Sequence, residues 1–324
     1  MPNSSQMSEQ TFAYWLTVPV AVVLVALVIY PTLYSLWISL WDVNFTFNSW
    51  KFVGLQNYVD AFTSPSTWDS VRLTITYVLW VTFISGIVGL GGALLLNEAF
   101  PGKAALVAIV ILPWAVSTFA AAVIWRYMYS EQFGLFNTVI LGLGLKAEPV
   151  NFLTETWVLP AIALAHSWQF SPLGMYFMLA ALQVIPPDMY KLARIDRLGV
   201  IGRFTRVTFP YLKTPMFIFL VLVTAEAAKV FDIIYFLSAG GPGTASHDLV
   251  YQIYVDSFVS LRLGVGAAEA WILIILITVI TMAYFKFIMM KQKSEVMLGT
   301  AEGSATARQR GIIRLGDEQP GGSS

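Results

Sequence analysis

The sequence predicts an all-α, polytopic membrane protein with six transmembrane helices and one short helix at the cytoplasmic face. Composition supports the membrane class: 57% of the 324 residues are hydrophobic and only 12% are charged, about half the charged share of a soluble domain. Distribution supports the number of spans, because the hydrophobic residues gather in long runs with few or no charges. Such runs cross a bilayer as helices when they reach about 20 residues.

Six runs have this length. We predict spans at 12–35, 73–96, 104–125, 157–182, 214–237 and 267–288. Pro19 and Pro31 in the first run, and Pro113 in the third, are interruptions that transmembrane helices tolerate. The glycines between Gly86 and Gly92 allow close approach of a neighbouring helix. The connections 42–70, 126–154 and 240–262 are mixed or polar and are interpreted as loops, the first with short helices.

This pattern divides the chain into three parts. Residues 1–11 form a cytoplasmic tail, 12–290 form the membrane domain, and 291–324 form a disordered cytoplasmic tail, because they are rich in Gly, Ser and Arg.

Lysine and arginine orient the chain by the positive-inside rule. With the N-terminus inside, thirteen of the 19 cations lie on the inner side and five on the outer side, and Lys229 lies within a span. The outer five are Lys51, Arg72, Arg126, Lys146 and Arg262. Both termini are therefore predicted to be cytoplasmic.

Composition also argues against several kinds of chemistry. The chain has no cysteine and only two histidines, His166 and His247, so we expect neither thiolate chemistry nor a metal site. Acidic and basic residues are equal in number, which gives no charge bias toward nucleic acid. No G-x-x-x-x-G-K-[ST] phosphate loop, H-E-x-x-H or G-x-S-x-G motif is present. We therefore expect a non-enzymatic chain without a cofactor of its own.

A basic island separates the fourth and fifth spans at residues 185–210. Met189, Leu192, Ala193, Ile195, Phe204 and Val207 recur within it at helical spacing. We interpret the island as an amphipathic helix at the inner membrane face. The simpler alternative is a basic loop that only holds anionic lipid headgroups.

The island resembles the cytoplasmic coupling loop of binding-protein-dependent ABC importer permeases. That family's pattern places Glu-Ala-Ala and a glycine before a closing proline, and its sugar-importing branch begins with I-P and a tyrosine. The matching residues are Ile185, Pro186, Tyr190, Ala193, Ile195, Asp196, Phe204, Val207 and Pro210. Lys191 and Leu192 replace the first two residues of the Glu-Ala-Ala triplet, and Arg197 replaces the glycine. Gly199 is expected to serve a similar turn.

Three further elements continue the resemblance in the same order along residues 12–285. Phe52–Tyr58 matches F-x-G-L-x-N-Y, and Leu112-Pro113-Trp114 matches L-P-x. The stretch Phe231–Pro242 matches F-D-x-I-Y-x-L-T-x-G-G-P, with Phe231, Asp232, Gly240, Gly241 and Pro242 as its structural residues. Together these motifs resemble the first permease of maltose- and glycerol-phosphate-type importers.

The resemblance implies a type I ABC importer permease fold and one half of a translocation path for a sugar-like solute. Disaccharides, oligosaccharides, polyols, glycosides and glycerol phosphates remain open. The implied partners are a second homologous permease, two ATP-binding subunits that hold ATP and Mg²⁺, an extracytoplasmic solute-binding protein and the lipid of a bacterial inner membrane. The implied coupling residues are Tyr190, Lys191, Leu192, Ala193, Asp196, Arg197, Gly199, Phe204 and Pro210.

Candidates for the solute path come from charged and aromatic residues in the spans. Glu226, Lys229 and Asp232 recur every three residues, so one helix would present them as a stripe. They either neutralise one another at a helix interface or line the path, and Asp232 belongs to the structural motif. The aromatic candidates are Tyr77, Trp114, Trp168 and Tyr235. His166 is interpreted as a hydrogen-bond partner between helices.

Two other functional classes compete with the importer. An ion-coupled secondary transporter would show matched broken helices in two halves and a cation site near the midplane, and we find no such repeat. An integral membrane enzyme would need a catalytic motif.

Overall fold

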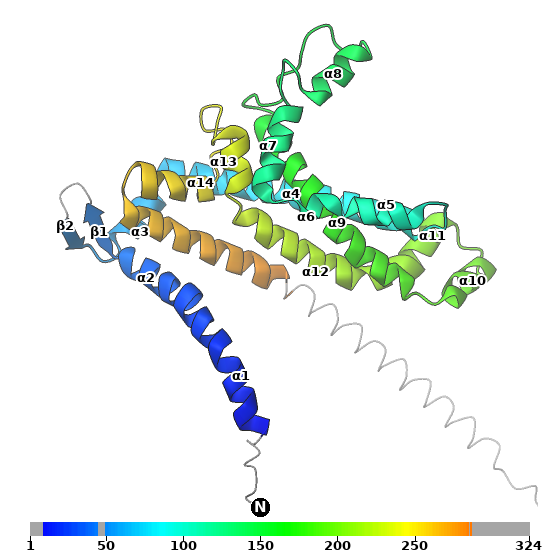
Figure 1. The fold of residues 1–324 in the computed structure, drawn as a ribbon, viewed down its shortest axis with the longest axis horizontal. Coiled ribbons are helices and arrows are strands. Elements are labelled where there is room, and N and C mark those ends of the chain that lie inside the picture. Colours follow the sequence, from blue (N-terminus) through cyan, green and yellow to red (C-terminus); the bar gives the residue numbers. More distant parts are fainter. Residues whose placement is uncertain (1–8, 45–48, 285, 287–324) are drawn as a thin grey trace, which may run out of the picture. The chain divides into compact units, whose positions relative to one another are not determined.

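The computed structural model describes residues 9–44, 49–284 and 286, and these residues are predominantly helical (Figure 1). Within them, four helices are long and apolar enough to cross a membrane: Tyr14–Ile38, Pro65–Asn97, Val200–Ala228 and Leu263–Tyr284. Two bent pairs, Lys103–Ala115 with Thr118–Met128 and Val158–Val184 with Pro187–Ile195, raise the number to six if each pair is one span. The predicted all-α class is confirmed. The predicted tail 291–324 and residues 1–8 lie outside the described residues.

The first span consists of α1 (Glu9–Leu24), the π-helix η1 (Val25–Ile29) and α2 (Tyr30–Ile38). The most apolar stretch of this span has no buried residue. Valine and leucine side chains along it are exposed in this single chain, so lipid or another subunit must cover them.

A β-hairpin follows where the sequence suggested only loop and short helices. Strands β1 (Trp41–Asn44) and β2 (Ser49–Phe52) pair antiparallel, and α3 (Gln56–Thr63) comes next. Asn57 explains the F-x-G-L-x-N-Y element, because its buried amide donates to the Ser39 carbonyl at 2.9 Å and the Trp41 carbonyl at 3.0 Å. Periodicity did not predict these strands, because each has only four residues.

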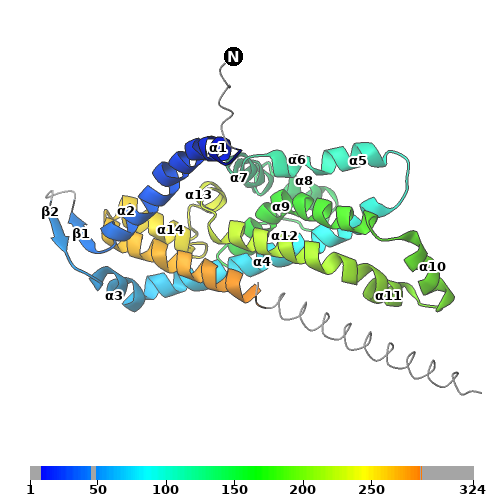
Figure 2. The ribbon, with the colours of Figure 1, turned by 90° about the horizontal axis from the view of Figure 1, so that it is seen from below.

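Three long helices form the core: α4 (Pro65–Asn97), α9 (Val158–Gln183) and α12 (Phe209–Ala228). All three pairs are in contact, and Figures 1 and 2 show them side by side. Gly89 of α4 faces Gly174 of α9 so closely that a Cβ on Gly89 would lie 3.4 Å from the Gly174 backbone. The buried ring of Phe219 on α12 covers Gly174. Small residues thus bring the helix backbones together.

The third predicted span is sharply bent. It comprises α5 (Lys103–Val110), α6 (Leu112–Ala115) and α7 (Thr118–Met128). The break lies at Val116–Ser117 rather than at Pro113, and the two parts meet at 100°. Pro113 is tolerated because it lies in the first turn of α6, where a backbone N–H has no helical partner. The Ser117 hydroxyl caps α7 by accepting from the Ala120 N–H.

Three boundaries in the second half differ from prediction. The segment 126–154 contains α8 (Leu135–Gly142). The fifth span ends at Ala228, and α13 (Asp232–Ser238) is a separate helix. The segment 240–262 holds α14 (Leu249–Tyr254) and the π-helix η3 (Val255–Val259).

Polar contacts join this C-terminal region to α4. The Thr67 hydroxyl donates to buried Glu269 at 2.9 Å, and the Leu249 N–H donates to the Thr74 hydroxyl at 2.9 Å.

Candidate functional site

The coupling segment contains a nine-residue helix, α10 (Pro187–Ile195). Pro187 suits the first helical position, and Asp188 lies in the first turn and Arg194 in the last, as the helix dipole favours. The helix is shorter than predicted. Residues 204 and 207 instead belong to the next span, which begins with α11 (Val200–Arg203) and the π-helix η2 (Phe204–Thr208) and then continues into α12.

The two faces of α10 have different surroundings. Tyr190 and Ala193 face inward: Ala193 is buried, and the Tyr190 hydroxyl lies 3.1 Å from the Thr208 hydroxyl of η2. Leu192 and Ile195 face outward, with 56% and 75% of their surface exposed. The predicted coupling residues are therefore divided between an anchoring face and a free face. Phe204 and Pro210 lie at the start of the following span rather than on α10.

Lys191 also lies on the free side and pairs with Asp188 within α10. Its Nζ is 2.8 Å from Asp188 Oδ1, and both side chains are largely exposed. The cation at this position is thus already paired inside its own helix, although an exposed pair of this kind contributes little to stability.

Arg197 ends α10 in the left-handed region, with φ +55°. The Leu198 N–H donates to the Ala193 carbonyl and the Arg197 N–H to the Arg194 carbonyl, both at 3.0 Å. This pair of bonds is a Schellman motif, whose left-handed position favours glycine. The family's glycine therefore corresponds to Arg197 itself. The expectation that Gly199 serves this turn is wrong, because Gly199 has φ −66° and begins α11.

We predict that Arg197→Gly stabilises the chain. A non-glycine residue in the left-handed region costs about 1 kcal/mol, and glycine would remove that cost without breaking either backbone bond. Thermal unfolding of the full chain in detergent should show a higher midpoint for Arg197→Gly. The control is Arg203→Gly, which places glycine inside a helix and should lower the midpoint. An unchanged or lower midpoint for Arg197→Gly would contradict the prediction.

The charged path candidates do not form one stripe. Lys229 ends α12 with non-helical torsions, and Asp232 lies in the first turn of α13. Only Glu226 and Lys229 pair, with 2.9 Å between Oε1 and Nζ, and both are substantially exposed. The stripe prediction is therefore wrong for Asp232, because the helix breaks between the residues. Glu226 and Lys229 thus neutralise each other's charge, but on an exposed part of the chain and without Asp232.

An aromatic cluster, defined as Phe231, Tyr235, Tyr251 and Tyr254, follows the ion pair. The Phe231 ring lies 5.1 Å from the ring of Tyr235 and 5.0 Å from that of Tyr254. Tyr235 and Tyr251 lie 6.3 Å apart. All four side chains are half-buried. Sequence reasoning selected Tyr235 as a path candidate and Phe231 as a structural residue; the spacing of Tyr251 and Tyr254 on α14 was the available signal for the other two.

The remaining aromatic candidates lie elsewhere. Tyr77 is fully buried, and its hydroxyl is 2.6 Å from His166 Nδ1. Its prediction as a path residue is therefore wrong, whereas the interpretation of His166 as a partner between helices is confirmed. Trp168 lies partly exposed on α9 with its ring 6.0 Å from Trp125, and Trp114 is exposed on α6. The structure does not bring these two tryptophans to the aromatic cluster.

The Gly240-Gly241-Pro242 motif shapes the turn beside this cluster. Gly240 has φ +76°, and a Cβ there would lie 2.6 Å from Tyr251 Cε1. The Gly241–Pro242 peptide bond is cis. The Ser246 hydroxyl closes the turn by donating to the Gly241 carbonyl at 2.8 Å. Glycine at 240 thus lets the turn approach the aromatic ring.

Asp248 caps α14 from a buried position. Its Oδ1 accepts from the Tyr251 N–H at 2.9 Å. Burial raises the pKa of Asp248 to about 7, and hydrogen bonds from the Tyr251 and Val250 backbone oppose this shift. Because the raised pKa makes the folded state hold a proton that the unfolded state releases, stability falls as pH rises through about 7.

We predict that Asp248→Asn removes this pH dependence, because asparagine keeps a cap acceptor and cannot ionise. The wild-type chain should lose about 1 kcal/mol between about pH 6 and pH 8, and Asp248→Asn should not. Thermal midpoints of the full chain at both pH values measure the difference, with Asp232→Asn as an exposed control. Equal losses in Asp248→Asn and wild type would contradict the assignment.

A hollow of about 710 Å³ lies next to α13 and was not predicted. Its lining combines Arg126, Glu131, Gln132 and Asn151 with the rings of Tyr127, Phe133 and Phe236. Arg126 is held there by a hydrogen bond from Nη1 to the Phe236 carbonyl at 3.1 Å. The Phe236 ring packs 5.0 Å from Tyr235, so this hollow adjoins the aromatic cluster. Planar polar groups beside aromatic rings are typical of small-molecule sites.

Comparison with known proteins agrees with this architecture. Residues 85–289 match the family described as binding-protein-dependent transport system inner membrane component. The trehalose/maltose transport system permease protein MalF of Thermococcus litoralis is 36% identical over 281 residues, which are 86% of this chain and 94% of that protein. The sn-glycerol-3-phosphate transport system permease protein UgpA of Salmonella typhi is 32% identical over 278 residues, 85% of this chain and 93% of that one.

A solved structure supports the fold. A bacterial ABC transporter involved in the import of the acidic polysaccharide alginate superposes with a TM-score of 0.73 at 20% identity, over 85% of this chain and 94% of that one. The predicted type I ABC importer permease fold is confirmed. The chain belongs to the family of binding-protein-dependent transport system inner membrane components, the permease subunits of ABC importers.

Proposed function

We propose that this chain forms half of the translocation path of an ATP-driven importer for a sugar-like solute, and that α10 couples it to a separate ATPase. One observation carries the coupling role: the outward face of α10 presents Leu192 and Ile195, and both are largely exposed. Apolar side chains on a polar segment outside the spans favour a protein partner. Tyr190 holds the helix against the next span, so force on α10 would reach α12.

The remaining subunits of the assembly follow from the family. We propose a second homologous permease, two ATP-binding subunits with ATP and Mg²⁺, and an extracytoplasmic solute-binding protein, in a bacterial inner membrane with both termini inside. The unburied first span supports a second permease, because it has apolar surface for another subunit. A solved relative of this fold is an alginate transporter in complex with an alginate pentasaccharide-bound periplasmic protein. The chain itself carries no catalytic role in this proposal.

For the solute, we propose a hydroxyl-rich molecule that passes the Glu226–Lys229 pair and the aromatic cluster. Tyrosine hydroxyls and the ion pair offer hydrogen bonds, and the aromatic rings offer flat apolar faces. A sugar has complementary groups, because its hydroxyls form hydrogen bonds and its ring has an apolar face. Named relatives transport trehalose or maltose and sn-glycerol 3-phosphate, which supports this class of solute. Trp114 and Trp168 stay candidates for a path completed by the second permease.

Co-purification tests the proposal. The full chain, expressed with its native genomic neighbours and extracted in mild detergent, should bring an ATPase and a second permease with it. In proteoliposomes, trehalose, maltose or glycerol 3-phosphate with its binding protein should stimulate ATP hydrolysis. Transport by the chain alone on an ion gradient would instead support the ion-coupled alternative and would overturn the proposal.

We predict that Lys191→Glu lowers solute-stimulated ATPase activity several-fold. The family pattern that α10 resembles has glutamate here, so the lysine either meets an acidic counterpart on this chain's ATPase, which a glutamate would repel, or leaves coupling to the loop of the second permease. We propose the acidic counterpart. Lys191→Gln removes the charge without reversing it and serves as the matched control, with a smaller loss expected. Unchanged coupling in Lys191→Glu would exclude the co-adapted charge.

A further inference from the structure

The segment between α7 and α9, residues 129–157, has a defined structure rather than that of an irregular loop, and we call it the module. The buried Asn137 amide donates to the Ser130 and Val150 carbonyls at 3.1 and 3.0 Å, and its carbonyl accepts from the Val150 N–H at 2.7 Å. The rings of Tyr129, Phe136 and Phe152 pack with centroids 5.4 to 5.8 Å apart. These contacts fix α8 and the following residues in one arrangement.

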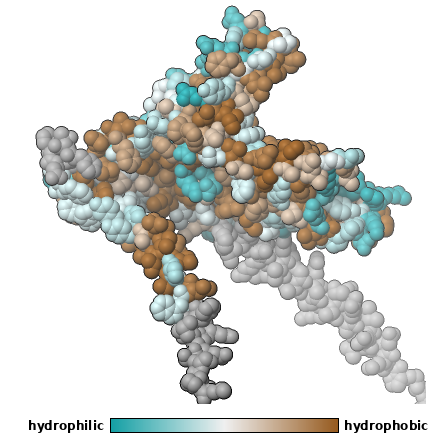
Figure 3. Space-filling model, in the orientation of Figure 1, coloured by the Kyte–Doolittle hydropathy of each residue, from teal (hydrophilic) through white to brown (hydrophobic). Residues whose placement is uncertain are grey.

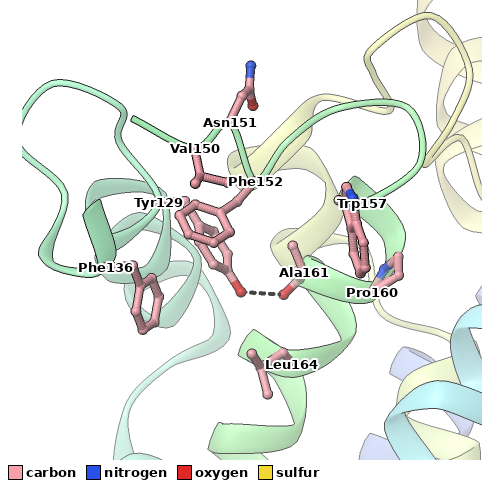
Figure 4. A pocket seen from close by; sticks show the side chains of 9 residues that line it. All are labelled: Tyr129, Phe136, Val150, Asn151, Phe152, Trp157, Pro160, Ala161 and Leu164. Atoms are coloured by element: carbon pink, nitrogen blue, oxygen red, sulfur yellow. Dashed lines mark hydrogen bonds between the residues drawn. The ribbon is translucent and has the colours of Figure 1, made fainter. Parts of the chain in front are cut away.

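A hollow of about 510 Å³ lies between this module and the first turns of α9 (Figure 4). Its lining consists of Tyr129, Phe136, Val150, Asn151, Phe152, Trp157, Pro160, Ala161 and Leu164. The lining has no charged side chain. The Tyr129 hydroxyl donates a hydrogen bond to the Ala161 carbonyl at 2.9 Å. The Asn151 side chain points away from the hollow in Figure 4, and its Oδ1 accepts from the Leu153 N–H.

The hollow is continuous with surface that a membrane must cover. Leu164 and Trp157 are exposed at the start of α9, a membrane-spanning helix of this family fold. Residues 132–145 contain no charge. Leu135 and Leu143 on the outer side of α8 are 55% and 69% exposed, and Figure 3 shows hydrophobic side chains on this part of the surface. Apolar surface of this kind is stabilised by hydrocarbon and not by water.

We propose that this hollow binds an acyl chain of a membrane phospholipid, with α8 lying in the membrane interface at the end of α9 away from α10. A sugar-like solute fits poorly, because its buried hydroxyls would lack partners there. A soluble protein that binds reversibly would need a polar rim, whereas the stretch 132–145 around α8 carries no charge. Exposed Trp157 and Tyr127 agree with an interfacial position, which such rings favour. The proposal requires only that α9 spans the membrane.

Photolabelling in lipid nanodiscs tests the proposal on the full chain. The probe is phosphatidylcholine with a diazirine in one acyl chain, and labelled peptides are mapped by mass spectrometry. Adducts should concentrate on Phe136, Phe152 and Leu164. Val150→Trp fills the hollow and should reduce this labelling at least about tenfold, whereas Val150→Ala should preserve it. Labelling of the exposed first span, for example at Leu16, should stay constant in all variants and reports that each remains inserted.

Leu164→Trp provides a second filling variant at a half-exposed site, in case Val150→Trp does not fold. Labelling of the module no stronger than that of the hairpin residues Trp50 and Lys51 would overturn the proposal. Strong labelling that neither tryptophan variant reduces would indicate general lipid contact and would also overturn it. Loss of module labelling when the second permease is present would assign the hollow to a protein contact instead.

Discussion

Replacing Ile195 with aspartate is expected to abolish solute-stimulated ATP hydrolysis by the assembled transporter while the chain stays folded. Ile195 is three-quarters exposed on the free face of α10, so the substitution removes little packing within this chain. In the proposed complex the same position is buried against the ATPase. A carboxylate buried there without a partner costs several kcal/mol, which corresponds to a loss of at least about a hundredfold in subunit affinity.

The measurement compares ATPase stimulation and subunit retention for Ile195→Asp with those for Val259→Asp. Val259 is similarly exposed and ends η3, which directly follows α14. Helix α14 lies at the far end of the helices from α10 in Figures 1 and 2. Val259→Asp should behave as wild type. Full stimulation in Ile195→Asp would remove α10 from the coupling interface and would contradict the central part of the proposed function.

The sequence predicted the long helices well because lipid imposes a simple requirement on them. An uncharged run satisfies its own backbone hydrogen bonds only as a helix, and α9 begins and ends within one residue of its predicted span, 157–182. Boundaries set by local contacts were less predictable. The break after Ala228 carries no glycine or proline, and it is associated with the aromatic cluster, whose members come from two segments. Helical periodicity likewise continued from α10 to Val207, although a turn at Arg197 separates the two helices.

The module around α8 shows the same limit. An eight-residue helix is marginal alone, and α8 depends on Asn137 bonds to residues as far as Val150. Glycines and an asparagine in this segment indicated a loop. For the candidate site, the sequence motifs predicted the positions of α10 and the Gly240 turn. The contacts of Phe231 with Tyr251 and Tyr254, and the position of Arg126, are visible only in the three-dimensional structure.

Gly174→Val is expected to prevent stable assembly of the three core helices. A Cβ at this position would lie 2.6 Å from Cε1 of the Phe219 ring, and Phe219 is fully buried among α4, α9 and α12. The ring cannot move into solvent, so α9 and α12 must separate. Overpacked cores lose about 1–3 kcal/mol and occasionally more, and we expect a loss at the upper end because the Gly89–Gly174 contact opens as well.

Size-exclusion profiles and thermal midpoints of the detergent-solubilised full chain measure this loss. Gly91→Val is the matched control, because nothing lies within 4 Å of a Cβ at Gly91, and it should change the midpoint little. Gly174→Ala combined with Phe219→Leu should recover part of the stability that Gly174→Ala loses, since the smaller side chain vacates the space the new methyl needs. Additive losses in the double variant would show that Gly174 and Phe219 do not interact, and the close contact would then not explain the glycine.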